Sequence, residues 1–363
     1  MKDNTDWLFA LKPNILQFLQ EMSSIQKTGY YRYSYSGDLY DENTHWNVGS
    51  SVFALKIYYT LGVEDNEDIE AAANYIKTFQ HENGWIYDNL IFRKSFLRNI
   101  LVSMKYRNFS NLLNKQYIRA ETRQCYSALM LFNKLPGTTK VPVPTTEKDI
   151  DNYLSVLNWH QPWAAGSHFS HLMFFLMLAC KTGRIKRDTF DYLTEYATKW
   201  VNRLQHPEDG CWYSGNPDLR IKVNGAMKIL TGLIAIDKAC FDYPEKLIDL
   251  CLEAENDESA CDNFNIILVL NYAGKLLSRA YRQSDIEKFA LRRLSIYNKY
   301  YHDDKKGFSF YMRKANNNYY GAKVSQGLDE PDIHGTVLFL WGISIIVQLL
   351  GMERELDFRE FKT

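Results

Sequence analysis

The sequence predicts an all-α protein whose helices pair into hairpins and close into a double ring. Three observations support this prediction. A helix end, a polar turn, a Gly and then an aromatic residue recur in the segments 75–85, 199–212 and 293–308, the third copy being the weakest. Six apolar segments with few charges begin with small or polar residues, and more polar segments lie between them. A motif that repeatedly ends one helix and turns toward the next is typical of an array of helical hairpins.

The six apolar segments predict the inner helices of the double ring. They start near residues 46–50, 122–125, 165–168, 223–226, 262–265 and 332–336, with amphipathic segments at 68–79, 190–204 and 285–300. A helix that is apolar on most sides has to be covered, so we expect the amphipathic helices to surround the apolar ones. The N-termini of the inner helices would then gather at one mouth, where unpaired N–H groups and helix dipoles favour anions.

Proline usage shows one plausible break in the chain. Four of the nine prolines fall within the segment 135–163, which we interpret as a Pro-rich connection. Because the repeat occurs on both sides of this connection, we expect a single domain over residues 1–363. A chain of this length with 46% apolar residues can bury one large core.

Charge and cysteine usage limit the partners. The 43 basic and 43 acidic residues cancel, so composition gives no reason to expect a nucleic-acid partner or bulk attraction to an anionic membrane. No stretch predicts a membrane span, and residues 1–6 lack the features of a signal peptide. The six cysteines contain no CxxC pair, which favours buried thiols. We therefore expect a cytoplasmic protein with a small-molecule or glycan substrate, and leave the oligomeric state open.

The Gln-to-Trp turns carry a family resemblance. Gln80 and Gln205 each precede a Gly and a Trp, and with the six inner-helix starts they resemble the (α/α)6 toroid of terpenoid cyclases and protein prenyltransferase β-subunits. The similar turns of those proteins are called QW repeats. The resemblance covers about Gly29 to Leu350. It implies an enzyme that acts on a diphosphate-bearing or polyene substrate in the central cavity of the toroid.

The prenyltransferase resemblance implies an anion site but not a zinc site. Arg220 and Lys222 match the basic positions that hold the diphosphate. Asn224 and Ala226 stand where the Asp and Cys zinc ligands would be, and only His334 matches the third ligand. One ligand of three does not hold zinc, so a zinc-dependent prenyltransferase is not expected. The chain also has no Gly-rich nucleotide fingerprint and no His-Glu-x-x-His, so we expect no metal and no cofactor.

Two acidic residues are predicted catalytic groups. Asp262 matches the middle Asp of the Asp-x-Asp-Asp with which squalene-type cyclases protonate an alkene, but Ala260 and Asn263 replace its neighbours. The alternative for Asp262 is a helix N-cap. Asp332, in the acidic cluster 329–332, also stands at a predicted helix start and is the second acid.

A different class of function follows from the lining predicted for the mouth. Its substrate-binding residues include the polar Asn47, Arg123 and Asn224 and the aromatic Trp46, Trp159, Trp163, Trp212 and Tyr213. Aromatic rings stack on sugars, and amide or guanidinium groups bond to hydroxyls and carboxylates. The lining therefore favours a carbohydrate-active toroid enzyme: a lyase, a hydrolase or an epimerase. In that case His168, with Asp332 or His334, would be the acid/base pair, and the tryptophans would bind the sugar.

The segment 158–171 is the densest local cluster, with three His and two Trp. His168 and His171 are one helical turn apart and share a face. His168 is a predicted general acid/base or hydrogen-bond donor; a metal pair and simple packing are the alternatives. A third hypothesis is a non-catalytic binding module with an exposed apolar patch. Because the repeat favours the terpenoid class, we take that class as the primary prediction.

Overall fold

The computed structural model describes residues 5–37, 47–107, 109 and 116–363. These residues are mostly α-helical, which confirms the all-α prediction. In chain order the elements are η2 (Asp6–Ala10), α1 (Leu11–Met22), α2 (Val48–Thr60), α3 (Glu67–Lys77), α4 (Asn89–Tyr106), α6 (Gln116–Leu131), α7 (Glu147–Ser155), α8 (Pro162–Lys181), α9 (Arg187–Asn202), α10 (Leu219–Ala235), α11 (Pro244–Glu253), α12 (Ala260–Leu276), α13 (Gln283–Asn298), β1 (Tyr301–His302), β2 (Gly307–Phe308), β3 (Asn318–Tyr319), β4 (Ala322–Lys323) and α14 (Ile333–Leu349). The strands form two short antiparallel hairpins, β1–β2 and β3–β4.

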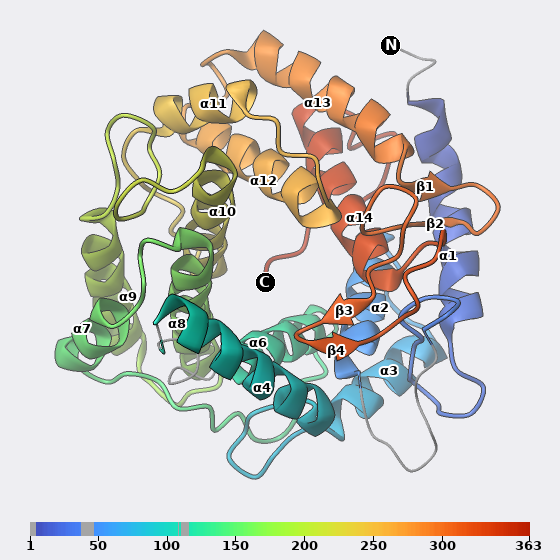
Figure 1. The fold of residues 1–363 in the computed structure, drawn as a ribbon, viewed down its shortest axis with the longest axis horizontal. Helices are drawn as coiled ribbons and strands as arrows, with labels where there is room; N and C mark the ends of the chain where they lie inside the picture. The colour runs from blue at the N-terminus through green and yellow to red at the C-terminus, as the bar shows by residue number, and fades with distance from the viewer. Residues whose placement is uncertain (1–4, 38–46, 108, 110–115) are drawn as a thin grey trace.

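Six helices, which we call the inner helices, surround a common centre: α2, α6, α8, α10, α12 and α14 (Figure 1). Each contacts the next one in this order, and α14 contacts α2. The helices α3, α9, α11 and α13 pack against α2, α8, α12 and α14 from outside. The end of the chain lies at the centre of the view in Figure 1.

Composition explains why these helices are inside. α14 carries no Asp, Glu, Lys or Arg along its length, and nearly all its side chains are buried. By contrast, α9 buries Phe190, Leu193, Ala197 and Val201 along one face and exposes its charges on the other. A surrounded helix can be apolar all round, whereas a covering helix needs only one apolar stripe.

Among the described helices, α8 alone is long and apolar enough to cross a membrane by length and composition. Of its most apolar window, 72% is buried inside the protein, against α6, α9 and α10. Such burial is typical of a core helix in a folded domain, so α8 is weak evidence for a membrane span.

Five of the six predicted inner-helix starts lie within about four residues of the observed ones, and the second prediction was wrong. α6 begins at Gln116, six positions before Thr122. The Thr122 hydroxyl does not cap the helix; it donates to the carbonyl of Ile86 and accepts from its N–H, both at 3.0 Å. A polar residue that binds a neighbouring turn was mistaken for a helix start.

The Pro-rich segment 135–163 contains a helix that the prolines did not reveal. Thr146 and Asp149 form a reciprocal capping box that starts α7. Pro162 is the first residue of α8, where its missing N–H costs nothing.

The first two copies of the repeated turn close in a similar way, the second being one residue longer. Gln80 bridges to Ile86 and Gln205 bridges to Trp212 in the antiparallel sense. Gly84 and Gly210 have φ of 84° and 72°, and a Cβ on either would lie 2.7 Å from a neighbouring backbone atom. Only glycine fits both demands. The third, weaker copy forms the β1–β2 hairpin instead, with Phe308 opposite Tyr301.

Candidate functional site

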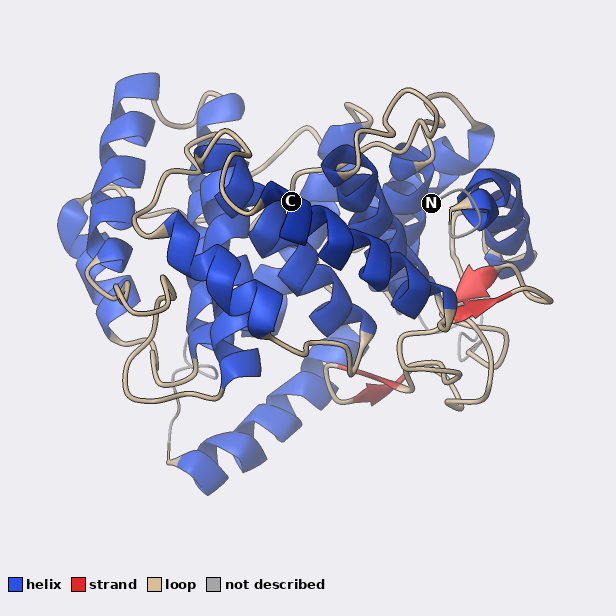
Figure 2. Ribbon diagram, turned by 90° about the horizontal axis from the view of Figure 1, so that it is seen from above, coloured by secondary structure: helices blue, strands red, loops and turns tan. Residues whose placement is uncertain are grey.

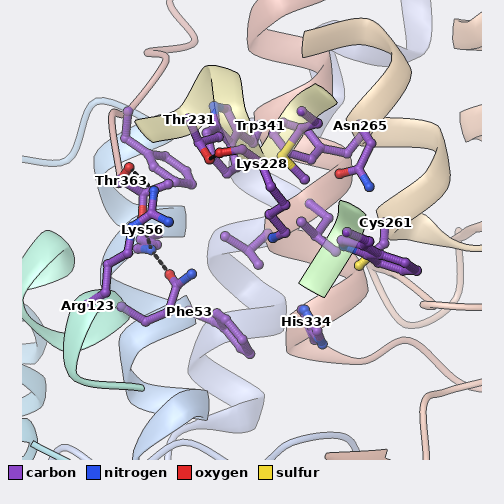
Figure 3. Close-up of a pocket in the computed structure, with 17 residues that line it drawn as sticks. Phe53, Lys56, Arg123, Lys228, Thr231, Cys261, Asn265, His334, Trp341 and Thr363 are labelled. Atoms are coloured by element: carbon purple, nitrogen blue, oxygen red, sulfur yellow. Dashed lines mark hydrogen bonds between the residues drawn. The ribbon is translucent and has the colours of Figure 1, made fainter. Parts of the chain in front are cut away.

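A cavity of about 110 Å³ lies at the centre of the inner helices (Figure 3). All six helices contribute to it, together with the end of the chain; we call it the central cavity. Its lining residues are Phe53 and Lys56 from α2, Arg123 and Gln124 from α6, Trp163 from α8, Met227, Lys228 and Thr231 from α10, Cys261, Phe264 and Asn265 from α12, His334, Val337, Leu338 and Trp341 from α14, and Phe361 and Thr363.

Three cationic side chains point into the central cavity, and among the described residues no acidic side chain lines it. Lys56 donates to the amide oxygen of Gln124 and, at 3.4 Å, to the Thr363 hydroxyl. Arg123 donates to the Ser170 hydroxyl and to the backbone oxygen of Thr363. The amine of Lys228 has no hydrogen-bond or ion-pair partner within the part of the chain that the structure describes. An unpaired amine therefore faces the cavity.

Burial changes the protonation of these groups. It lowers the pKa of Lys56 to about 7, with Arg123 the next cause, and lowers the pKa of Lys228 to about 8. It also lowers the pKa of Arg123 to about 9. Arg123 and Lys228 also disfavour the charged form of Lys56, and Arg123 disfavours that of Lys228, whereas the nearby Glu121 carboxyl partly opposes the shift of Lys56. A bound anion would reverse this effect, so the cavity is electrostatically suited to an anionic group.

Aromatic rings form the rest of the wall. Trp341 lies between Phe264 and Phe361, with centroid distances of 4.1 and 4.2 Å. Phe53 stacks on His334 at 4.5 Å. The Nδ1 atom of His334 lies 3.1 Å from the Tyr33 hydroxyl, and burial lowers the pKa of His334 to about 3. His334 is therefore a neutral imidazole at neutral pH.

The end of the chain lies at the centre of the view in Figure 1, and its residues Phe361 and Thr363 line the central cavity. Glu360 accepts from the Tyr272 hydroxyl at 2.9 Å and from the Gln348 amide at 2.9 Å. Thr363 also lines a second, larger cavity of about 620 Å³, whose other residues include Phe174, Met177 and Lys362. Thr363 therefore lines both cavities.

Three predicted site residues line the central cavity: Arg123, Trp163 and His334. The other described ones lie elsewhere. Asp262 is fully buried between α10 and α12, where its carboxylate accepts two hydrogen bonds from Arg220, at 3.0 and 3.1 Å. It also accepts from Asn224 at 2.9 Å and from the Ser259 hydroxyl at 2.6 Å. Its oxygens already accept four hydrogen bonds, and its counter-ion is in place. The alternative prediction that Asp262 is the N-cap was wrong, because Ser259 occupies that position.

Lys222, in the first turn of α10, belongs to a different cluster, which it forms with the turn that precedes α10. Its amine lies 2.9 Å from an Asp209 carboxylate oxygen, 3.1 Å from the Tyr213 hydroxyl and over the Tyr213 ring. The Tyr213 ring stacks on His206 at 3.9 Å. Trp212 donates its indole N–H to Asn202 at 3.1 Å and is buried. This cluster fixes the second repeat turn.

Asp332 caps α14, as its position at a helix start indicated. Its carboxylate accepts from the N–H groups of Gly335, Phe310 and Asn316, at 2.8 to 3.0 Å. Burial raises its pKa to about 7, and these hydrogen bonds oppose that rise. Asp332 holds the loop before α14 and does not line the central cavity.

His168 is fully buried, and its Nδ1 atom lies 3.0 Å from the Tyr153 hydroxyl of α7. His171 is one turn further along α8, with ring centroids 5.7 Å apart. Burial lowers the pKa of His168 to about 3 and lowers that of His171 too. Within the described ranges, no group of three or more His, Cys, Asp or Glu side chains is arranged to hold a metal ion.

Of the remaining predicted residues, two are buried in the protein interior and one lies outside the residues that the structure describes. Trp159 is buried against Trp200 and donates to the carbonyl of Leu154 at 3.1 Å. Asn47 is buried with φ of 58° immediately before α2, and its backbone N–H donates to Asp88. Trp46 lies outside the described residues.

Sequence reasoning missed Lys56, Lys228 and Trp341. The two lysines did carry a signal, because each is a single charge within an otherwise apolar helical run, 48–60 and 223–235. A cation in such a run needs a cavity or a partner. Trp341 carried no comparable signal, since α14 is apolar all round.

No protein-family model matches this chain, and no curated protein matches it.

Proposed function

We propose that this chain is an (α/α)6 toroid whose central cavity binds a small molecule with an anionic group and an apolar body, and that it acts on a diphosphate-bearing substrate of the terpenoid-cyclase and prenyltransferase class. The closed series of contacts among the six inner helices supports the toroid. The two turns that close in a similar way, at Gln80 and Gln205, support the resemblance to that class.

One observation carries the ligand class: Lys228 points an unpaired amine into a cavity that Lys56 and Arg123 also line. Burying charge without a partner is costly, so a site with three cations gains most from a ligand with several negative charges. Phosphate and diphosphate groups meet that need and accept hydrogen bonds from both lysine and arginine. The rings of Phe264 and Trp341 offer an apolar surface next to the cations.

The same arrangement suggests how the site acts on such a substrate. Cations placed where a diphosphate departs stabilise the negative charge that develops on it. In this proposal Lys56, Arg123 and Lys228 replace Arg220 and Lys222 as the anion-binding groups. Asp262 and Asp332 have no part in it, because their carboxylates are already bonded outside the cavity.

A carbohydrate-active function is the second candidate, and one observation favours it. Trp163 and His334 were both predicted for that function, and both line the central cavity. A uronic acid would bring a carboxylate to the cations and a sugar face to an indole.

Calorimetric titration separates the two candidates. The ligands are pyrophosphate, farnesyl diphosphate and uronic-acid oligosaccharides, on the wild type and on Lys228→Met. We expect both diphosphates to bind the wild type, and the Met variant to lose about tenfold or more in affinity, because one charge-assisted hydrogen bond is lost. Binding of the oligosaccharides alone would replace the proposal with the carbohydrate function.

Lys222→Ala is the matched control, since Lys222 is a lysine that the resemblance assigns to the diphosphate but that lies outside the cavity. Its diphosphate affinity should equal that of the wild type. Loss of binding in Lys222→Ala with retention in Lys228→Met would place the anion at the turn before α10 and contradict the proposal.

A further inference from the structure

Helix α4 projects from the body of the molecule, at the lower edge of the view in Figure 2. Asp88 caps it and accepts from the N–H groups of Leu90 and Ile91. Among the described elements, its contacts are with α6 and with strand β4. One face of α4 therefore packs on the protein, and the opposite face is exposed.

Helix α4 leaves more large apolar side chains exposed than a covering helix normally does. The face toward the protein buries Ile91, Ser95 and Ser103, which are 0%, 3% and 2% exposed. The outer face exposes Leu97, Leu101 and Met104, which are 60%, 69% and 63% exposed. These three positions follow the spacing i, i+4 and i+7, so they form one line along the helix. Folding stability does not explain this pattern, because it leaves the larger apolar side chains in water.

Basic residues flank the exposed apolar line. Arg93 lies on one side of it, and Lys94 and Arg98 lie on the other, as the helical period of 3.6 places them. All three are exposed, and none of them forms an ion pair with the described residues. The segment 89–107 holds five basic residues and no acidic one: Arg93, Lys94, Arg98, Lys105 and Arg107. The chain is neutral as a whole, so this positive charge is a local feature of α4.

We propose that α4 is an interfacial helix that binds the protein to the surface of an anionic lipid bilayer. A helix with an apolar stripe between rows of Lys and Arg lies in the headgroup region, with the apolar stripe in contact with acyl chains. The basic rows pair with anionic headgroups, each cation adding binding free energy near the surface. Leu97, Leu101 and Met104 supply the apolar contact. The binding is peripheral and needs no membrane span.

The charge pattern favours lipid over other occupants. A second copy of this chain that docked through the same face would bring its own basic rows against these, and like charges repel. Single-stranded nucleic acid would match the charge, but it stacks on aromatic side chains, and the central line of this face is aliphatic. An anionic lipid surface satisfies both halves of the pattern, with headgroups opposite the cations and acyl chains opposite the aliphatic line.

Vesicle co-sedimentation tests the proposal. One set of vesicles is pure phosphatidylcholine and the other contains roughly a quarter phosphatidylglycerol. We expect the full chain to sediment with the anionic set only and to detach when salt rises from about 0.1 M to about 0.5 M. The triple variant Arg93→Gln/Lys94→Gln/Arg98→Gln should bind about a hundredfold more weakly. The variant Leu97→Ser/Leu101→Ser/Met104→Ser should also lose most of its binding.

The matched control replaces three exposed lysines on other helices or loops: Lys148→Gln/Lys186→Gln/Lys199→Gln. It removes the same total charge and should bind like the wild type. Equal binding to both vesicle sets, or equal loss in the control, would overturn the proposal. So would a dimer that the Leu97/Leu101/Met104 variant dissociates while vesicle binding persists, because that face would then be a contact between copies. Diphosphate affinity is measured on the same variants and should not change, because none of the substituted residues lines the central cavity. Vesicle binding therefore tests the proposal for α4, and diphosphate binding tests the proposal for the central cavity.

Discussion

Arg220 and Asp262 form a bidentate ion pair that joins the first turns of α10 and α12, with donor–acceptor distances of 3.0 and 3.1 Å. Asp262 is completely buried, whereas 38% of the Arg220 side chain is exposed. The resemblance assigned one residue to the substrate diphosphate and the other to proton donation. In the structure each residue is the partner of the other.

Arg220→Ala should therefore destabilise the fold. It leaves the buried Asp262 carboxylate with only Asn224 and Ser259 as side-chain donors. Because solvent reaches part of Arg220, we expect a loss of about 2 kcal/mol in the free energy of unfolding, below the range for a fully buried pair. Urea unfolding measures it. Lys199→Ala, which breaks an exposed ion pair with Glu195, should cost less than about 0.5 kcal/mol. Similar small losses in both variants would show that the Arg220–Asp262 pair contributes little.

Phe361→Ala should open the apolar side of the central cavity. The Phe361 ring stacks on Trp341 and lies 5.2 Å below the Lys56 amine, so it fills space that an apolar ligand would need. We expect the affinity for octyl phosphate to rise by about fivefold or more, because the space that the ring fills becomes available to the alkyl chain. The affinity for inorganic phosphate should change little. Calorimetric titration measures both.

Phe358→Ala is the control for that substitution, because Phe358 is an aromatic residue of the same segment and does not line the central cavity. If both variants gain the same affinity, general loosening of the segment is the cause. If Phe361→Ala gains none, the ring and the ligand do not share a site.

Sulfate binding to the central cavity should weaken as pH rises. The pKa values of Lys56 and Lys228 are lowered to about 7 and about 8, so each amine loses its proton as pH passes these values. A bound anion favours the charged amines, which moves the loss to somewhat higher pH. The Kd for sulfate should rise by up to about tenfold per pH unit for each amine that titrates, between about pH 7 and pH 9. Sulfate is the probe because its own charge is constant there.

Of the other titratable groups near the two amines, His334 and Cys261 keep their charge in this range, whereas the Glu121 carboxyl, whose pKa burial raises to about 7, becomes negative within it and adds to the weakening. His334 is neutral because its pKa is lowered to about 3, and Cys261 is neutral because burial raises its pKa to about 12. Arg123, with a pKa lowered to about 9, begins to lose its proton only at the upper end. Lys228→Met should give weaker binding with a shallower pH dependence. The range from about pH 6 to about pH 9 spans the pKa values of both lysines. A sulfate Kd that stays constant over this range would contradict the proposal that these amines bind the anion.

The fold was predictable because its signals are local or periodic. α14 could be placed within one residue, since its apolar run has a sharp polar start at Asp332. The repeated turns were predictable because Gly84 and Gly210 meet a backbone requirement that no other residue meets. The start of α6 was not predictable. Thr122 resembles a helix cap in the sequence, but its hydroxyl bonds to Ile86, in a turn that is distant in the sequence and adjacent in space.

The site was less predictable, because convergence depends on the rotation of each helix. A shift of two residues rotates a side chain by about 200° about the helix axis, which is enough to move it from the centre to a neighbouring interface. Arg123 and His334 face the cavity, whereas Asn224 and His168, on helices of the same kind, face the gaps between helices. The resemblance directed attention to the turn before α10, and the lone lysines of the inner helices were the better signal.

His168→Gln should make the protein less sensitive to acid. The pKa of His168 is lowered to about 3 by burial, so below its ordinary value of about 6.5 the unfolded chain takes up a proton that the folded protein does not. Stability is therefore lost as pH falls from about 6.5, by about 2 kcal/mol at pH 5 from this residue. The Gln variant lacks that loss. The difference in unfolding free energy between pH 7 and pH 5 should be about 2 kcal/mol smaller than in the wild type.

Comparing variant with wild type is necessary, because other buried groups titrate in the same window. His171 and His334 act in the same direction as His168, since burial lowers the pKa of each. Glu121 and Asp332 act in the opposite direction, since burial raises the pKa of each to about 7, and the folded protein therefore binds a proton at a higher pH than the unfolded chain does.

Tyr153→Phe is the control: it removes the hydroxyl that contacts Nδ1 of His168 and leaves His168 buried. It should lower stability at both pH values and keep the wild-type difference between them. If Tyr153→Phe abolishes that difference as His168→Gln does, the hydroxyl rather than burial controls the protonation of His168.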